Sequence, residues 1–234
     1  MPIANLDYPG AKLAMEVMNP VEEAYRLAAV KKEPFTVEFI EQIPPGAVFW
    51  DIGANTGPYS LIAAWRNLTV IAIEPGFNSY AALCRNLAMN NLLDRCLTLC
   101  LALGEQTRFD WLHYHDTRQG GASHVLGGVR KQSFHKQLVP VWAWDELVTR
   151  VPQPPDRPHF AKLDIDGGEL AALKGAQQFL RQPFVMGLMI EMHAEDEQEM
   201  TGLLKGLGWR LAARFDERDG QSMGDIAYGR FERG

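Results

Sequence analysis

A short apolar segment that ends in an acid and two spaced glycines constrains the fold most. Residues 47–50 are apolar, Asp51 follows, and Gly53 and Gly57 precede a second apolar segment at 59–65. This pattern predicts a β-strand, a tight glycine turn and an α-helix. In an open α/β sheet a nucleotide-like ligand lies at this first turn. Glycines allow close backbone approach there, and the start of the helix offers free N–H groups.

The spacing of the glycines separates two classes of ligand. A dinucleotide fingerprint is G-x-G-x-x-G, but Asn55 and Pro58 occupy the positions where its later glycines would stand. The pattern present is D-x-G-x-x-x-G, which is typical of S-adenosylmethionine (SAM) dependent methyltransferases. A second apolar strand, 70–73, ends in Glu74, and an acid about 20 residues past the turn suits hydrogen bonds to ribose hydroxyls. Glu74 fits NAD as well as SAM, so the glycine spacing carries the preference for SAM.

Composition and charge exclude several classes of protein. The length of 234 residues favours one main globular domain. A net charge of −6 without a basic stripe disfavours nucleic acid as the main partner. We predict no membrane span, because no run of 18 apolar residues exists, and no secretory signal. The cysteines, Cys84, Cys96 and Cys100, match no zinc motif, which predicts reduced and buried thiols in a cytoplasmic protein. The sequence leaves open whether the protein forms a homodimer.

The order of the predicted elements indicates an α/β fold. Asn19 and Pro20 start a helix that runs to about Lys32, and a second helix covers 35–42, so residues 1–45 form an N-terminal helical lead-in. We predict that residues 46–234 form a single domain, which the glycine spacing favours as a SAM-dependent methyltransferase domain. Alternating strands and helices predict a Rossmann-like, seven-stranded, mostly parallel sheet with helices on both faces and an antiparallel C-terminal hairpin. The predicted strands are 47–51, 69–74, 97–102, 159–164, 184–191, 208–215 and 225–232. The predicted helices are 58–66, 77–90, 167–181 and 195–206.

The segment between the two halves of this pattern is less regular. Residues 108–115 and 138–142 each read as a strand, and a glycine-rich stretch lies between them. Long loops in compact domains are often functional. We therefore predict that residues 116–136 form a substrate-facing loop or lid. Ser123 and His124 within it are the candidate contacts with the acceptor.

A second motif lies far from the first. It begins with Lys162, Asp164 and Asp166 and continues through Gly167-Gly168-Glu169 to Lys174-Gly175-Ala176. It resembles the K-I-D-V-E-G-A-E-x-x-x-L-K-G-A block of the FkbM family of SAM-dependent methyltransferases, and the resemblance extends over roughly residues 35–230. It implies methyl transfer from SAM to a hydroxyl of a sugar, glycolipid precursor or secondary metabolite. Asp166 stands where the family has Glu, and Gly168 where it has Ala.

The first motif supplies the predicted cofactor site. Glycines and acids of the turn and of the following strand hold the cofactor, and Asn55 tolerates left-handed geometry or contacts the methionine carboxylate. Residues after the third strand, Ala102 and Leu103, lie near the adenine. The predicted cofactor-binding residues are Asp51, Gly53, Asn55, Gly57, Glu74, Ala102 and Leu103.

Methyl transfer to a hydroxyl requires alignment of the acceptor and a group that takes its proton. Asp164 ends one predicted strand, and Glu191 and His193 end its neighbour. Residues i and i+2 share a face of a strand, so Glu191 can raise the basicity of His193. We predict these three as catalytic residues.

Asp166 and Glu169 are predicted to contact the acceptor. The pair also fits a capping box, with Asp166 as the helix cap, and Lys162 fits an ion-pair partner of a nearby acid. Oxygen ligands of Asp164, Asp166 and Glu191 could hold a divalent ion, but we predict no metal.

Two other functions remain open from the sequence. One is an NAD(P)-dependent oxidoreductase or sugar epimerase, against which the missing glycine pattern argues. The other is a non-catalytic SAM-binding protein on the same fold, against which the intact glycines and cofactor acids argue.

Overall fold

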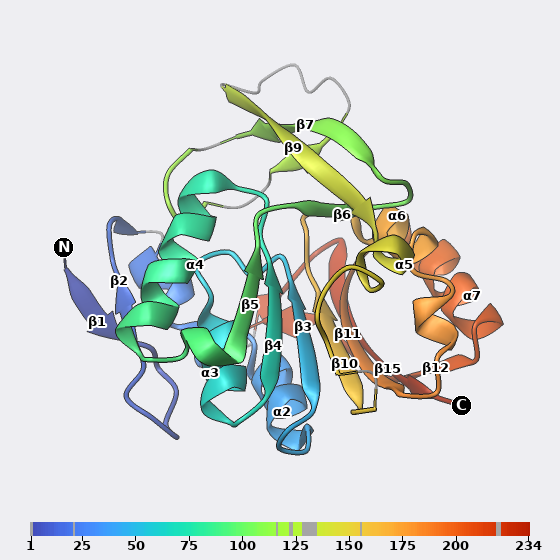
Figure 1. The fold of residues 1–234 in the computed structure, drawn as a ribbon, viewed down its shortest axis with the longest axis horizontal. Helices are drawn as coiled ribbons and strands as arrows, with labels where there is room; N and C mark the ends of the chain where they lie inside the picture. The colour runs from blue at the N-terminus through green and yellow to red at the C-terminus, as the bar shows by residue number, and fades with distance from the viewer. Residues whose placement is uncertain are drawn as a thin grey trace.

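The protein is described by a computed structural model that covers residues 2–20, 22–115, 117–121, 124–127, 135–154, 156–218 and 221–234. Its centre is a seven-stranded sheet in the order β12-β15-β11-β10-β3-β4-β5 (Figure 1). The strands are β3 (Val48–Ile52), β4 (Thr69–Ile73), β5 (Cys96–Leu99), β10 (His159–Leu163), β11 (Val185–His193), β12 (Trp209–Phe215) and β15 (Ile226–Arg233).

Strand directions in this sheet follow the predicted Rossmann-like pattern. The pairs β11-β10, β10-β3, β3-β4 and β4-β5 are parallel. The C-terminal strands β15 and β12 pair antiparallel with each other, and β15 also pairs antiparallel with β11. The α/β fold class and the antiparallel hairpin are therefore confirmed. Because all the parallel strands end at one edge, polar residues that follow β3, β4, β10 and β11 meet there.

Helices cover both faces of the sheet (Figure 1). One apolar core packs under α2 (Pro34–Gln42), α3 (Pro58–Trp65) and α4 (Phe77–Met89). A second core packs under α5 (Trp144–Leu147), α6 (Glu169–Lys174) and α7 (Glu197–Gly206). The predicted helix 167–181 is shorter than expected, because α6 ends at Lys174 and the chain turns before a 3₁₀ helix at Phe179–Arg181.

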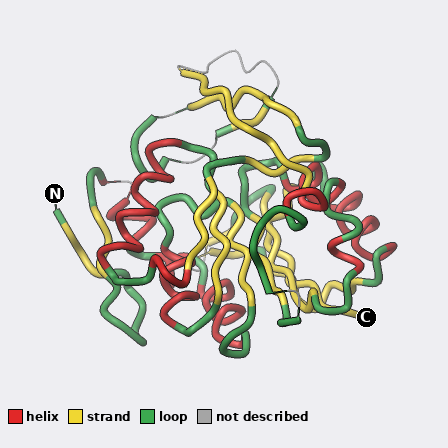
Figure 2. The backbone as a smooth tube through the Cα atoms, in the orientation of Figure 1, coloured by secondary structure: helices red, strands yellow, loops and turns green. Residues whose placement is uncertain are grey.

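A smaller second sheet lies across the end of the main one. The sequence predicted two of its strands, 108–115 and 138–142, but not their assembly into a separate sheet. Its strands are β6 (Ala102–Gly104), β7 (Arg108–Tyr114), β8 (Val125–Leu126) and β9 (His135–Ala143), in the order β6-β9-β7-β8. The yellow tubes at the top of Figure 2 show β7 and β9 above the main sheet. The predicted strand 97–102 is in fact two strands, since β5 ends at Leu99 and β6 joins the second sheet.

The N-terminal segment begins with a hairpin that the sequence did not predict, and helices follow it. Strands β1 (Ile3–Asn5) and β2 (Ala14–Glu16) pair antiparallel. The side chains of Asn86 and Asn90 on α4 accept hydrogen bonds from main-chain N–H groups of β2, and these bonds hold the hairpin against the domain. The predicted helix over 20–32 is divided into a π-helix at Glu22–Arg26 and α1 (Ala29–Lys32). The domain boundary at residue 46 stays a prediction.

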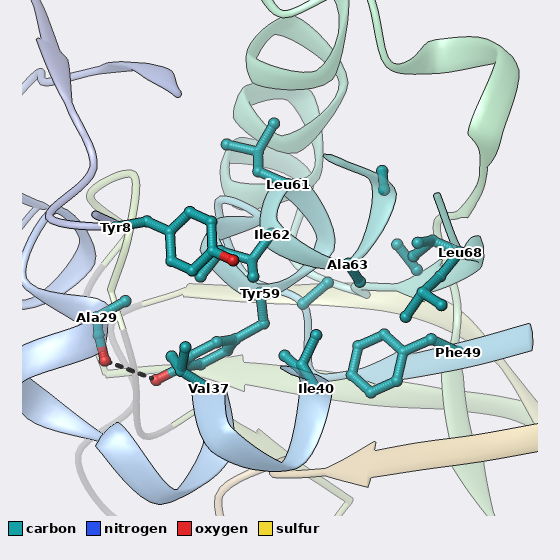
Figure 3. Close-up of a cluster of buried hydrophobic side chains, with 14 of the residues drawn as sticks. Tyr8, Ala29, Val37, Ile40, Phe49, Tyr59, Leu61, Ile62, Ala63 and Leu68 are labelled. Carbon is teal, nitrogen blue, oxygen red and sulfur yellow. Dashed lines mark hydrogen bonds between the residues drawn. The ribbon is translucent and has the colours of Figure 1, made fainter. Parts of the chain in front are cut away.

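Tyr59 connects this N-terminal segment to the core. Its ring lies among Val37, Ile40 and other apolar side chains (Figure 3), and its hydroxyl lies 2.8 Å from Glu33 Oε2 and 3.4 Å from Ala29 O, the two acceptors that its single proton can reach. All three cysteines are free thiols, as predicted, but the prediction that they are buried is wrong, because Cys84 and Cys96 are half-buried and Cys100 is exposed. Within the described part of the chain, no helix has both the length and the apolar character needed to cross a membrane.

Candidate active site

A cavity of about 370 Å³ opens at the carboxyl ends of the central strands. Its walls come from the turn after β3, the end of β4, the segment after β10, and the N-terminal segment. Cavities of this size and position hold small ligands in open α/β folds. Most of the residues predicted from the two motifs therefore meet in one place.

The turn after β3 needs its glycines for packing of the chain against itself. Gly53 has φ +83°, and a Cβ there would lie 1.8 Å from the main-chain oxygen of Asp164. Gly57 has φ +90° and caps α3, and a Cβ there would lie 2.5 Å from Cδ1 of Leu83. Gly53 lines the cavity, whereas Gly57 lies behind it. The first motif therefore brings the end of β3 close to the end of β10.

Asp51 lies beneath this turn and does not line the cavity. Its side chain is fully buried, and the Ser60 hydroxyl donates to its Oδ2 at 2.6 Å. Burial raises the pKa of Asp51, and the charge of Lys162 opposes that rise. Asp51 therefore orients the first turn of α3.

Glu74 and Asn55 form one polar wall of the cavity. Glu74 Oε2 accepts the Asn55 N–H at 2.9 Å and its Oε1 accepts the Gly76 N–H at 2.7 Å. Each carboxylate oxygen can accept a second bond, so Glu74 still suits two ribose hydroxyls. Burial raises its pKa to about 7.

Asn55 has an unused acceptor beside Glu74. Its backbone is left-handed, with φ 51°, and its Nδ2 donates to Gly121 O at 2.8 Å. Its Oδ1 is buried and has no hydrogen-bond partner among the described residues. Because a buried polar atom without a partner is costly, this oxygen suits a donor group on a ligand. Ala102 and Leu103 supply apolar surface on another wall, as an adenine ring requires.

The acidic end of the cavity is centred on Asp164. Its Oδ2 accepts the Lys162 ammonium at 2.8 Å and the Tyr228 hydroxyl at 2.9 Å. Burial opposes the charge on Lys162, but the carboxylates of Asp164 and Asp51 outweigh it and raise the pKa of Lys162. Glu191 also lines the cavity and lies within 3.3 Å of the Tyr228 hydroxyl. The motif predicted Lys162 only as an ion-pair partner and gave no signal for Tyr228.

His193 lies behind Glu191 and does not line the cavity. Its Nε2 is 3.5 Å from Glu191 Oε2. The interaction with Glu191 raises the pKa of His193 to about 9. The imidazole is therefore protonated at neutral pH and holds a positive charge beside the carboxylate.

Asp166 does not cap the following helix, which corrects one of the two interpretations of the D-x-x-E pattern. The N-cap of α6 is Gly168, and Asp166 has φ 58°. Glu169 instead closes the turn, because its two carboxylate oxygens accept the N–H groups of Ile165 and Gly167 at 2.7 and 3.0 Å. Asp166 lines the cavity, whereas Glu169 is buried beneath it with a pKa raised to about 8 by burial.

The buried acids also form a cluster with a histidine. Ligand atoms of Glu169, Glu191 and His193 lie within 4.8 Å of one another, a separation at which a metal ion could bind. Both Glu169 oxygens already accept main-chain N–H groups. We therefore assign no metal role to the cluster, and the absence of a metal stays a prediction.

The predicted lid, residues 116–136, contributes four described residues to the cavity wall: Gly121, His124, Val125 and Leu126. His124 lines the cavity, with its ring centre 4.7 Å from that of Tyr114. Ser123 lies outside the described residues. Arg26 was not predicted, yet its Nε and Nη2 donate to Gly120 O at 3.0 and 2.8 Å, and it lines the cavity together with Lys32. No sequence pattern marks these two cations, because they lie far from both motifs.

Comparison with known proteins decides the family. A sequence model described as the methyltransferase FkbM domain matches residues 51–211, more than half of the 234-residue chain. The chain belongs to this family. The match starts at the acid of the first motif and includes the whole of the second, so the predicted resemblance is confirmed. It leaves Arg26, Lys32 and Tyr228 outside the matched region.

Relatives of this FkbM-domain chain are also methyltransferases. It is 26% identical over 192 residues to the hexuronic acid methyltransferase AglP of Haloferax volcanii, over 79% of this chain and 72% of that protein. The solved structure of precorrin-6y C5,15-methyltransferase from Geobacter metallireducens is similar, with a TM-score of 0.53, 12% identity and coverage of 94% and 93% of the two chains. An rRNA methylase from Streptococcus thermophilus gives a TM-score of 0.51 at 12% identity, over 93% of this chain and 98% of that one. The two structures support the fold.

Proposed function

We propose that this methyltransferase transfers a methyl group from SAM to a hydroxyl group of a sugar. One observation carries the proposal: the glycine turn with Glu74 and the carboxylate of Asp164 line the same cavity. SAM supplies the methyl group and a thioether leaving group when it is bound. The chain then has to hold the cofactor, orient the hydroxyl and take up its proton.

The proposed cofactor contacts follow from the cavity walls. Glu74 accepts the two ribose hydroxyls, and the unpaired Oδ1 of Asn55 accepts a donor from the methionine part. Ala102 and Leu103 pack against the adenine. Gly53 and Gly57 shape the turn, and Asp51 holds the helix that follows it.

We assign uptake of the proton to Asp164. Its carboxylate lines the cavity, and Lys162 and Tyr228 fix it in place. His193 is less suited to be the first proton acceptor, because it lies outside the cavity and is already protonated at neutral pH. Glu191 supports Asp164 as a second carboxylate, and His193 balances its charge.

The acceptor is proposed to be a sugar that carries a carboxylate, free or as part of a glycolipid precursor or secondary metabolite. Arg26 and Lys32 place two cationic side chains on the cavity wall, and a guanidinium suits a carboxylate partner. The relative from Haloferax volcanii is a hexuronic acid methyltransferase by name, which supports this class. His124 and Asp166 are the proposed contacts with the sugar hydroxyls, and Ser123 is retained as a prediction.

An assay with methyl-labelled SAM tests the proposal. Glucuronic and galacturonic acid are compared with glucose and galactose, and the products are analysed by mass spectrometry before and after mild alkali. We expect an alkali-stable methyl ether on the uronic acids, and a rate lowered about 10²–10⁴-fold by Asp164→Asn with S-adenosylhomocysteine binding retained. An alkali-labile methyl ester, an N-methylated product, or oxidation that depends on NAD(P) would contradict it.

A further inference from the structure

Tyr228 occupies a position in the site that neither motif indicated. It lies on β15 directly opposite Glu191 of β11 in the antiparallel register, and its side chain is fully buried. It also lies outside residues 51–211, the region that defines the family. Its contacts with the acidic end of the cavity are therefore supplied by the C-terminal hairpin.

The Tyr228 hydroxyl lies between two carboxylates. It is 2.9 Å from Oδ2 of Asp164 and 3.3 Å from Oε1 of Glu191. A phenol has one proton to donate, so the Tyr228 hydroxyl donates a hydrogen bond to only one of these carboxylates at a time. The carboxylate that receives this hydrogen bond is the more strongly stabilised of the two.

Aromatic packing fixes the hydroxyl in this place. The Tyr228 ring centre is 5.0 Å from that of Phe35 on α2, and Phe35 stacks on Phe215 of β12 at 4.7 Å. All atoms of Tyr228 are shielded from solvent. The hydroxyl can change its partner by rotation of its proton alone, without movement of the ring.

Charged groups on every neighbouring element face the two acids. Lys162 on β10 donates to Asp164, the carboxyl groups of Asp51 on β3 and Glu169 on α6 interact with Asp164 and Glu191, and His193 lies beside Glu191. Asp166 adds a further negative charge near Glu191. Burial raises the pKa of Glu191, and the charge of Asp164 raises it further. The two carboxylates therefore sense each other's charge.

We propose that Tyr228 is a positioning residue that passes its hydrogen bond from Asp164 to Glu191 as Asp164 takes up a proton. The inference rests on the proposed function, in which the bond from carbon to the acceptor oxygen forms, the bond from carbon to sulfur breaks, and the hydroxyl proton moves to Asp164. Before transfer the phenol stabilises the Asp164 carboxylate. After transfer it stabilises Glu191, the carboxylate that keeps its charge.

Carboxyl titration by NMR tests this coupling without acceptor or cofactor. The protein is labelled with ¹³C at aspartate Cγ, and the Asp164 signal is assigned by its loss in Asp164→Asn. Tyr228→Phe removes one hydrogen bond to the carboxylate, so we expect the pKa of Asp164 to rise by about one unit. An unchanged or lowered pKa would overturn the proposal.

A double-mutant cycle separates the hydrogen bond from simple charge repulsion. Glu191→Gln removes a nearby negative charge and leaves a neutral amide oxygen, a weaker competitor for the phenol proton than a carboxylate, so both effects lower the pKa of Asp164. In the Tyr228→Phe background only the charge effect remains, and we expect a smaller decrease. Equal decreases in the two backgrounds would show that Tyr228 does not couple the acids.

Two further variants keep the test decisive. Tyr8→Phe is the matched control, because the Tyr8 hydroxyl donates to the carboxylate of Glu41 at 3.1 Å and does not line the cavity. It should leave the Asp164 titration unchanged. If Tyr228→Phe does not fold, 3-fluorotyrosine at position 228 keeps the shape with a stronger donor and should lower the pKa of Asp164. An unchanged pKa there would overturn the inference, whereas failure of sugar methylation would overturn only the proposed function.

Discussion

Gly53 and Gly46 have nearly the same backbone angle, φ +83° and +84°, but different surroundings. A Cβ at Gly46 would meet nothing within 4 Å, whereas one at Gly53 would overlap the main-chain oxygen of Asp164. Gly46→Ala should therefore cost only the left-handed strain of about 1–2 kcal/mol. Gly53→Ala should cost at least about 2 kcal/mol more, because the ends of β3 and β10 must separate. Urea denaturation measures the free energy of unfolding of both variants. Equal losses of stability would contradict the close approach of Gly53 to the main-chain oxygen of Asp164.

Burial of Glu74 makes cofactor affinity depend on pH. With a pKa of about 7, its carboxyl is largely protonated at pH 6 and ionised at pH 8. Because an ionised carboxylate accepts hydroxyl donors more strongly than a protonated one, the proposed contact of Glu74 with the ribose predicts that S-adenosylhomocysteine binds about tenfold more tightly at pH 8 than at pH 6. Calorimetric titration measures this.

The variant Glu74→Gln is the control for that titration. It should weaken binding about 10–100-fold and remove the difference between the two pH values. An affinity of the native protein that is flat or falls with pH would assign the cofactor contact to another group.

The sequence predicted those site residues that come directly after a strand of the parallel sheet. Glu74 and Asp164 come directly after parallel strands, so topology alone brings them to one edge. Arg26, Lys32 and Tyr228 reach the site from segments whose local sequence resembles ordinary surface or core. Their contributions depend on tertiary packing, which no local pattern encodes.

Among the structural elements, the N-terminal segment closes one side of the cavity. The guanidinium of Arg26 donates twice to Gly120 O, and Asn19 Nδ2 donates to Gln119 O at 2.8 Å. Residues 117–121 are therefore held to the π-helix at 22–26.

Arg26→Ala should release this loop. Each lost charge-assisted hydrogen bond is worth about 1.5–3 kcal/mol, so amide exchange at Gly121 should become roughly tenfold faster or more. Arg66→Ala is the matched control, because Arg66 donates to the main-chain oxygen of Glu41 and does not line the cavity. Hydrogen exchange measured by mass spectrometry tests this prediction. Equal exchange rates at Gly121 in the two variants would show that the hydrogen bonds from Arg26 to Gly120 O do not hold the loop.

The regular alternation of strands and helices made the main sheet predictable, whereas no comparable pattern showed how the strands outside it pair. Strands β3 and β4 are continuous apolar runs followed by helical periodicity, which is the pattern of a parallel sheet. The second sheet pairs β6 with β9 over some forty intervening positions, a contact that short-range patterns do not contain. The N-terminal hairpin has strands of three residues, too short for periodicity to reveal.

At the scale of the whole molecule, three buried or paired groups make stability fall with rising pH. The pKa values of Glu74, Glu169 and His193 are raised in the folded state to about 7, 8 and 9. The folded protein therefore binds more protons than the unfolded chain between pH 7 and 9, mainly at Glu169 and His193. The free energy of unfolding should fall by about 1.4 kcal/mol per pH unit for each such group.

Urea denaturation at pH 7, 8 and 9 checks the sign of this dependence. In the variant His193→Gln, the free energy of unfolding should fall less steeply above pH 8 than in the native protein, because Glu169 ionises in that range and only His193 still holds an extra proton. A stability that rises over this range would contradict the raised pKa values.

The central claim is that the cavity of this methyltransferase binds SAM, and ligand-induced thermal stabilisation tests it most directly. Melting is followed with S-adenosylhomocysteine, SAM, NAD and NADP, each far above its expected dissociation constant. At about 100 times that constant a ligand adds roughly 2.7 kcal/mol, which raises the melting temperature of a domain of this size by about 5–10 °C. We expect this rise with the first two ligands alone. A rise only with NAD or NADP would contradict the assignment of the glycine turn and of Glu74 to SAM.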